Sequence, residues 1–274
     1  MVIPWNLTRH LAGQESADVI VISPAKAGRT WLRVMVNKYI SLRYGVPFSV
    51  DNLHEHDAKI PSIVWEHWLW LHLRLATFKQ RLRGRYIIPA RVLNEKKLVL
   101  LVRDPRDIVV SAYFQESKRG SKHKRTEMPI QQYLRDRKRG IASVVRVLNL
   151  THQKTREHPH TLVVKYEAMK ANPTAELRRV LEFSGIPIDE PLLAQAVEFG
   201  SFDNMKKMEQ GDEFNSPRLR PGDPHDADSF KVRKGKIGGY KDYFDADDIA
   251  YLEPQVAKLD PVFGYGRSAT YNGQ

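Results

Sequence analysis

Apolar residues follow two patterns along this chain, short unbroken runs and longer stripes at helical spacing. The runs at residues 18–23, 97–102 and 161–165 are rich in Val, Ile and Leu, and turns or helical patterns follow them, as expected of buried parallel strands. From Thr30 to Leu42, apolar residues recur at helical spacing and stop near Gly45. This pattern predicts a helix directly after the first strand.

Further helical patterns cover residues 106–118, 130–150 and 174–183, so helices alternate with the predicted strands. Such alternation favours an α/β fold with a central parallel sheet flanked by helices. At 274 residues, the chain is long enough to form one large domain, and we interpret residues 1–274 as a single domain.

Two longer stretches interrupt this alternation. Residues 60–82 carry a stripe of apolar side chains with a basic end, QRLRGR, and we predict an amphipathic helix inserted there. Residues 209–230 are rich in Pro, Gly and Asp and show no period. A long loop of this kind in a compact domain is often functional, and we predict a mobile lid.

The net charge of +12 arises from 44 Lys and Arg against 32 Asp and Glu, and it favours anionic partners such as a nucleotide, an acidic sugar or a membrane surface. The absence of cysteine excludes thiolate catalysis and Cys-ligated zinc. The most apolar stretch, IVWEHWLWLHLRLATF, is interrupted by charged and polar side chains, so no transmembrane segment is expected. The N-terminus shows no secretory signal, and we expect a cytoplasmic enzyme.

The stretch SPAKAGRTWL follows the first predicted strand and has the parts of a phosphate-binding loop. Ala27 and Gly28 allow the backbone to approach a ligand, Lys26 supplies a cation, and Thr30 supplies a hydroxyl at the start of a helix whose N–H groups are free. Loops that bind Mg²⁺ and a nucleoside triphosphate end in Gly-Lys-Ser/Thr, whereas Arg29 and Thr30 occupy that place here. A phosphate ester without a bound metal therefore fits this loop better.

Two other stretches carry anion-binding groups. Arg103 follows the strand at 97–102, and Ser111 lies eight residues later on the predicted helix, so the two can converge on a second phosphate. Near the predicted lid, Arg233, Lys234 and Gly235 combine two cations with a permissive backbone. Each stretch alone is weak evidence, and all three together indicate a ligand with two separate phosphates.

Together these stretches resemble the cytosolic-type sulfotransferases that use 3′-phosphoadenosine-5′-phosphosulfate (PAPS), and several bacterial members most closely. The family's phosphosulfate loop reads roughly YPKSGTTWL, and residues 24–32 read PAKAGRTWL. The family's 3′-phosphate site pairs an Arg with a Ser eight residues on, and its C-terminal RKGxxGxWK resembles RKGKIGGYK at 233–241. The resemblance, which spans residues 18–245, implies a fold like that of the P-loop nucleotide hydrolases.

Weaker similarities imply the remaining donor contacts. YEAMKANPTAEL resembles the family's YEDLKxDPxxEI, which implies that Tyr166 lies at the adenine. SFDNMKK resembles a segment whose aromatic residue packs on the base, which implies the same for Phe202, beside Ser201, and Trp31 matches the family's loop tryptophan. The resemblance implies PAPS as donor, 3′,5′-ADP as product and no metal, because Lys26 and helix N–H groups can neutralise the leaving phosphate.

The general base is not found in the expected segment. Animal members carry a His in a Lys-Thr-His-x-Pro segment, and the corresponding FKQRLRGRYIIPARVL has no His. The nearest histidines upstream of it are His54, His56, His67 and His72. Because a His-Asp pair in a loop resembles several bacterial sulfotransferases, we predict that His56 is the base, oriented by Asp57 or Glu55, with His54 as the alternative.

The resulting hypothesis is in-line transfer of a sulfuryl group to a hydroxyl or amine, with Lys26 and His56 as the catalytic residues. The tryptophans of 60–82 suit an apolar or lipid-like alcohol or a peripheral membrane contact, whereas the basic segment 117–125 suits a glycan. One alternative is an ATP-dependent small-molecule kinase, which the missing Gly-Lys-Ser/Thr disfavours. Another is a polyanion or nucleic-acid binder, which is disfavoured because the most specific cations lie at strand–helix junctions. The oligomeric state stays open.

Overall fold

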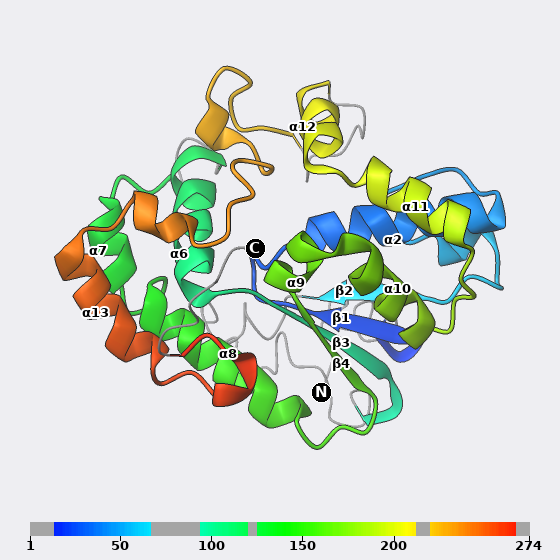
Figure 1. The fold of residues 1–274 in the computed structure, drawn as a ribbon, viewed down its shortest axis with the longest axis horizontal. Helices are drawn as coiled ribbons and strands as arrows, with labels where there is room; N and C mark the ends of the chain where they lie inside the picture. The colour runs from blue at the N-terminus through cyan, green and yellow to red at the C-terminus, as the bar shows by residue number, and fades with distance from the viewer. Residues whose placement is uncertain (1–13, 67–93, 120–124, 212–219, 267–274) are drawn as a thin grey trace, which may run out of the picture.

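The computed structural model describes residues 14–66, 94–119, 125–211 and 220–266. A four-stranded parallel sheet with the order β2-β1-β3-β4 forms its centre (Figure 1). The strands are β1 (Val19–Ile22), β2 (Ile63–Glu66), β3 (Lys97–Val102) and β4 (Thr161–Lys165).

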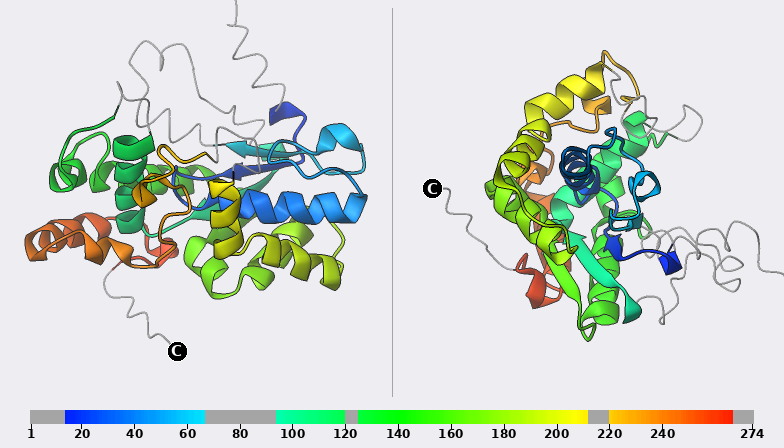
Figure 2. Two further views of the ribbon diagram at one scale, coloured as in Figure 1. Left: turned by 90° about the horizontal axis from the view of Figure 1, so that it is seen from above. Right: turned by 90° about the vertical axis from the view of Figure 1, so that its right-hand side faces the viewer.

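Helices cover both faces of the sheet, as its apolar strands require (Figure 1, Figure 2). Alternate residues of β1 and β3 point to opposite faces, so Val21 and Ile22 belong to different cores. The first core is closed by α2 (Arg29–Tyr44), α9 (Tyr166–Ala171), α10 (Pro173–Phe183) and α11 (Glu190–Phe199). The second is closed by α6 (Pro105–Phe114), α7 (Ile130–Arg135), α8 (Ile141–Thr155) and α13 (Ala246–Val256).

The segment predicted as one helix over residues 130–150 forms two helices, α7 and α8. The carboxylate of Asp136 accepts hydrogen bonds from the backbone N–H groups of Lys138 and Arg139, at 2.9 and 2.7 Å, and so closes a turn between them. Gly140 ends this turn, where a Cβ atom would lie 2.1 Å from the carbonyl oxygen of Leu134. Similarly, the helix predicted to continue to residue 118 ends at Phe114 and is followed by a π-helical turn, Gln115–Arg119.

The prediction of an amphipathic helix over residues 60–82 is wrong at residues 63–66. Ile63–Glu66 form β2, whose residues pair in parallel with β1 from Val19↔Ile63 to Ile22↔Glu66. A short apolar run fits a strand and a buried helix equally well by periodicity alone, which explains the error. The rest of that prediction lies outside the described residues.

The lid predicted over 209–230 is described only at its ends. α12 (Phe202–Gln210) covers its start, and the short helix η4 (Ala227–Ser229) lies near its end. Residues 212–219 lie outside the described part, so the lid stays a prediction. Within the described ranges, no helix has the length and apolar character needed to span a bilayer.

The parallel register brings several strand ends to one edge of the sheet. The loop 23–28 follows β1, Arg103 follows β3, and α9 begins at Tyr166 directly after β4. In such sheets ligands bind at the carboxyl ends of the strands. This edge is therefore where the predicted anion-binding groups meet.

Candidate functional site

A cavity of about 470 Å³ lies at this edge of the sheet. Its wall combines the loop after β1, the start of α6, the start of α12 and the segment 231–243. It contains nearly all the predicted donor-binding residues: Lys26, Gly28, Arg29, Thr30, Trp31, Arg103, Ser111, Tyr166, Ser201, Phe202, Arg233, Lys234 and Gly235. Segments more than 200 positions apart in sequence thus line one hollow.

The loop after β1 curves tightly around the start of α2. Lys26 and Gly28 both have positive φ, 73° and 98°, and Gly28 caps the helix. A Cβ atom on Gly28 would lie 2.6 Å from Cδ2 of Tyr166, so this position accepts only glycine without movement. Ala27 is fully buried in the core beneath the loop, which means that only its backbone can face a ligand.

Lys26 is surrounded by other cations. Its Nζ atom donates a hydrogen bond to Oε1 of Gln115 at 3.2 Å. Burial lowers the pKa of Lys26 well below its usual value, and the charges of Lys231, Arg119 and Arg103 lower it further. Such a site favours an anion, because a bound negative charge relieves the repulsion among these groups.

Arg103 lies between the first loop and α9. Its guanidinium lies 4.1 Å from the ring centroid of Tyr166, and its Nη1 donates to the backbone oxygen of Lys26 at 3.3 Å. Ser111 lies two turns along α6, partly exposed, and lines the same cavity. The predicted second phosphate site therefore opens onto the same hollow as the first.

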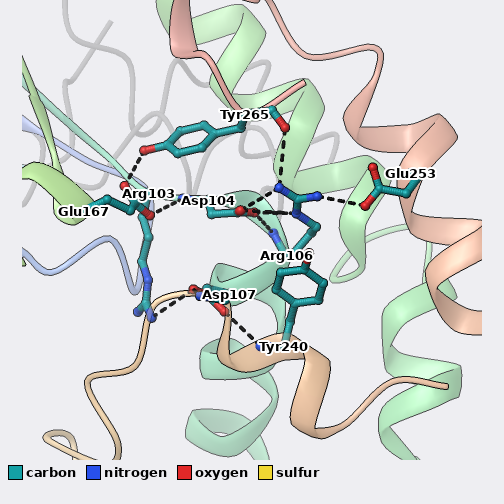
Figure 3. Close-up of polar contacts among 9 residues, drawn as sticks. Arg103, Asp104, Arg106, Asp107, Glu167, Tyr240, Glu253 and Tyr265 are labelled. Carbon is teal, nitrogen blue, oxygen red and sulfur yellow. Dashed lines mark hydrogen bonds and ion pairs between the residues drawn. The ribbon is translucent and has the colours of Figure 1, made fainter. Parts of the chain in front are cut away.

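Asp107 connects this second site to the C-terminal motif, a role that the sequence did not reveal. Its carboxylate lies 3.7 Å from Nη2 of Arg103 and accepts hydrogen bonds from the backbone N–H groups of Gly238 and Tyr240, at 2.9 and 3.0 Å (Figure 3). Burial raises the pKa of Asp107, against the opposing effect of Arg103. The carboxylate thereby fastens residues 238–240 to α6.

Behind the cavity, a network of mostly buried charged side chains holds the end of β3 (Figure 3). Asp104 caps α6 by accepting from the backbone N–H of Arg106, whose guanidinium also binds Asp104, at 2.8 Å, and Glu253, at 2.8 Å. Glu167 accepts from the backbone N–H of Asp104 at 2.9 Å and from the hydroxyl of Tyr265 at 2.6 Å. The network fixes the turn on which Arg103 and Asp107 stand.

The basic pair of the C-terminal motif has two different environments. Arg233 stacks on Phe114, with 4.0 Å from its guanidinium carbon to the ring centroid, and it donates to the carboxylate of Asp228 and the hydroxyl of Tyr243. The side chain of Lys234 is more exposed and lies 3.6 Å from Asp242. Arg233 is thus held in place, whereas Lys234 stays close to solvent.

Aromatic side chains form the other wall of the cavity. Nε1 of Trp31 donates to the backbone oxygen of Gly200 at 2.7 Å, and its ring meets the ring of Tyr166 edge-on at 5.7 Å. Ser201 caps α12, so Phe202 begins that helix. A Cβ atom on Gly235, whose φ is 58°, would lie 2.8 Å from Cε2 of Phe202, so the C-terminal motif approaches this ring closely.

The predicted base is not part of this arrangement. His56 is exposed on the short helix η1 (His54–His56) and does not belong to the lining of the described cavity. Six residues later, Ser62 accepts a hydrogen bond from the backbone of Val19, at the amino end of the sheet. Nδ1 of His54 lies 2.5 Å from the backbone oxygen of Ile60. The predicted role of His56 therefore stays a prediction, and His67 and His72 lie outside the described residues.

Glu66 is a titratable residue near the first loop that the sequence reasoning missed. It ends β2 beside Ile22, and its backbone oxygen accepts from the N–H of Ser23 at 3.2 Å. Burial raises the pKa of Glu66 to about 7, although the charges of Arg29 and Arg33 oppose the shift. Recognising IVWE as a strand would have placed this carboxyl at the carboxyl edge of the sheet.

Comparison with known proteins gives the family. The family model described as "Sulfotransferase domain" matches residues 16–258. Mouse sulfotransferase 1A1 is 28% identical over 219 residues, covering 78% of this chain and 67% of the mouse protein. Flavonol 4′-sulfotransferase of Flaveria chlorifolia is 24% identical over 295 aligned positions, covering 97% and 87%.

Solved structures agree with the fold. Mouse SULT7A1 complexed with PAP has a TM-score of 0.58 at 17% identity, covering 90% of this chain and 87% of that one. Retinol dehydratase in complex with androsterone and inactive cofactor PAP has a TM-score of 0.56 at 18% identity, covering 93% and 83%. The predicted α/β fold and the predicted enzyme class are thereby confirmed, while the closer resemblance to bacterial members stays a prediction. The family match covers most of the chain, which therefore belongs to the sulfotransferase domain family.

Proposed function

We propose that this sulfotransferase moves the sulfuryl group of PAPS to a hydroxyl or amine of a small acceptor and releases 3′,5′-ADP. One observation carries the proposal: the Lys26 loop and the pair Arg103 and Ser111 open onto a single cavity. PAPS carries a phosphosulfate on the 5′ carbon and a phosphate on the 3′ carbon of one ribose, so it needs two such anion sites at one edge of the sheet. The cavity also has aromatic side chains against which the adenine can pack.

At one end, Lys26 and the first N–H groups of α2 would hold the 5′-phosphosulfate. Negative charge grows on the bridging oxygen as the sulfuryl group departs, and an ammonium already held there stabilises it. The other end would use Arg103, Ser111 and Arg233 for the 3′-phosphate, with Lys234 near the rim. Adenine would lie against the aromatic wall of Trp31, Tyr166 and Phe202.

The acceptor must lose a proton during transfer, which calls for a general base. We keep His56 in this role, with Asp57 or Glu55 orienting it and His54 as the alternative, on the support of the His-Asp pair in the sequence. Relatives named for flavonols and steroids support an apolar alcohol or phenol as acceptor, over a glycan.

Thermal-shift titration tests the donor site. Because the cavity has two anion sites and the loop lacks Gly-Lys-Ser/Thr, 3′,5′-ADP should stabilise the protein more than ATP with Mg²⁺ does. The shift should be lost in Arg103→Ala and Lys26→Ala and kept in Lys154→Ala, an exposed residue on α8. A response to ATP with Mg²⁺ alone would favour the kinase alternative. Salt-sensitive binding of generic nucleic acid without PAPS turnover would favour the polyanion binder.

Single-turnover assays with PAPS and a panel of phenols and alcohols test the base. His56→Ala should bind 3′,5′-ADP like the wild type and lose sulfuryl transfer by about 100-fold or more. His54→Ala, on the same short helix, is the comparison variant. It should keep sulfuryl transfer if His56 is the base and lose it if His54 is. Transfer at the parent rate in His56→Ala would reject the assignment and leave the donor site unaffected.

A further inference from the structure

Lys231 lines the same cavity as Lys26 but has no part in the mechanism above. It lies two residues before the RKG motif, in a segment fastened to the end of α12. The carboxylate of Glu209 accepts hydrogen bonds from the backbone N–H of Lys231, at 2.6 Å, and of Val232, at 2.9 Å. The backbone that carries Lys231 is therefore held in a fixed position at the cavity wall.

The charges around Lys231 are mostly positive. Glu209 is its main counter-charge, and that carboxylate is shared with Nη1 of Arg119, at 2.8 Å, and with the two backbone N–H groups. Arg119 is itself held by the backbone oxygen of Ser229, at 2.8 Å. Within the described part of the chain, the charged groups that act on Lys231 include Arg119, Arg29, Glu209, Arg33 and Lys26.

This environment makes the ammonium of Lys231 easy to deprotonate. The pKa of Lys231 is lowered to about 7, mainly by burial and also by the charges of Arg119 and Arg29, while Glu209 opposes the shift. Of the charged neighbours, Lys231 also has the largest effect on the pKa of Lys26. Two ammonium groups that repel each other at one end of a cavity form a site for an anion of high charge.

We propose that Lys231 is a second ammonium for the donor's phosphosulfate group, alongside Lys26, and that donor binding transfers one proton from solvent to Lys231. The inference rests on the proposed function, because it assigns the Lys26 end of the cavity to the phosphosulfate. The bound anion stabilises the protonated form of Lys231, so binding is stronger at lower pH. Above pH 7 the affinity should fall by at most about tenfold per pH unit, as expected for one proton.

The test is isothermal titration calorimetry with 3′,5′-ADP, whose 5′-phosphate stands in for the phosphosulfate. Titrations at pH 7.5 and 8.5 in HEPES and in Tris, which differ in ionisation enthalpy, give the number of protons taken up. The nucleotide phosphates, with a second pKa of about 6, are ionised throughout this range, so proton uptake reports on the protein. The wild type should take up close to one proton at pH 8.5 and less than one at pH 7.5, where part of Lys231 is already protonated.

Lys231→Arg is the decisive variant, because arginine keeps the positive charge and does not titrate in this range. It should bind 3′,5′-ADP with an affinity that does not change between pH 7.5 and 8.5, and without proton uptake. Lys231→Met should bind at least about tenfold more weakly at pH 7.5, as expected for a lost charge-assisted contact. Lys154→Ala should match the wild type in both measurements.

The outcomes separate this inference from the function on which it rests. No binding of 3′,5′-ADP to the wild type would count against the donor site itself. Binding without proton uptake, or uptake that persists in Lys231→Arg, would overturn the role of Lys231 and leave the donor site in place. If Lys231→Met does not fold, the difference in proton uptake between the wild type and Lys231→Arg still tests the role of Lys231.

Discussion

Arg103, just before α6, and Asp107, in the first turn of that helix, face each other, with 3.7 Å between Nη2 of the guanidinium and the carboxylate. The same carboxylate holds the backbone N–H groups of Gly238 and Tyr240. A cation at a predicted phosphate site and the glycine-containing end of a distant motif are therefore connected through one side chain. The position of Asp107 affects both Arg103 and the approach of the C-terminal motif to the cavity.

Replacing Asp107 should weaken stability and nucleotide binding together. Asp107→Ala leaves two backbone N–H groups without their acceptor, and we expect a loss of about 2–4 kcal/mol in the free energy of unfolding. Asp107→Asn keeps one acceptor oxygen, so its free energy of unfolding should fall less. Urea denaturation and titration with 3′,5′-ADP measure both effects, with Asp247→Ala, an exposed residue on α13, as the control. Unchanged nucleotide affinity in Asp107→Ala would contradict the positioning role.

Arg103→Ala should remove selectivity for the 3′-phosphate. Because a charge-assisted contact is lost, the affinity for 3′,5′-ADP should fall about 10- to 100-fold. The affinity for 5′-AMP, which lacks the 3′-phosphate, should fall much less. Comparing the two nucleotides in wild type and variant gives a double cycle that isolates this contact. Equal losses for both nucleotides would show that Arg103 acts only through its packing on Tyr166.

The sequence predicted well those features that depend on local pattern. β3 and β4 have the predicted bounds because each is a short apolar run beside turn residues. Gly28 and Arg103 were found because a phosphate loop and a strand-end arginine have local signatures. The strand at Ile63–Glu66 was missed because a short apolar run fits two structures equally well.

Other features depend on contacts between distant segments and have no local signature. Asp107 accepts hydrogen bonds from Gly238 and Tyr240, which lie 131 and 133 positions further along the chain. Glu209 likewise binds the backbone N–H of Lys231, 22 positions further on. In the sequence, Lys231 is one more cation in a basic stretch. Only the fold shows that its charge meets that of Lys26 in the cavity.

Gly28→Ala should lower stability more than Gly45→Ala does. Comparing the two variants separates the cost of the positive φ from the cost of the clash with Tyr166. Both glycines have positive φ, which costs an alanine about 1 kcal/mol. A Cβ atom on Gly45 would meet nothing within 4 Å, whereas one on Gly28 would push the ring of Tyr166. Thermal unfolding should show the larger loss for Gly28→Ala, and only this variant should weaken 3′,5′-ADP. Equal losses in the two variants would show that the ring yields without cost.

Arg106→Met should destabilise the protein by about 3–5 kcal/mol, because it leaves the buried carboxylate of Asp104 without its cationic partner. The double variant Arg106→Met with Asp104→Asn should recover part of this loss, since it removes the uncompensated charge. Chemical denaturation of the two single variants and the double variant gives the coupling energy. Additive losses would mean that the two side chains contribute independently.

Glu66→Gln should change how stability depends on pH. The folded protein holds the pKa of Glu66 at about 7, above the value of 4.5 expected when unfolded, so the folded state binds more protons between these values. The free energy of unfolding therefore falls as the pH rises from 4.5 to 7, by on the order of 3 kcal/mol from this group at most. Glutamine does not titrate, so the variant does not lose this stability. The free energy of unfolding of the variant should therefore rise relative to that of the wild type between pH 4.5 and 7, and the difference should stay constant above pH 7. Urea denaturation at pH 4.5, 6, 7 and 8 measures the difference, with the exposed Glu95→Gln as control. Parallel pH profiles for wild type and Glu66→Gln would mean that burial leaves this carboxyl ionised as in water.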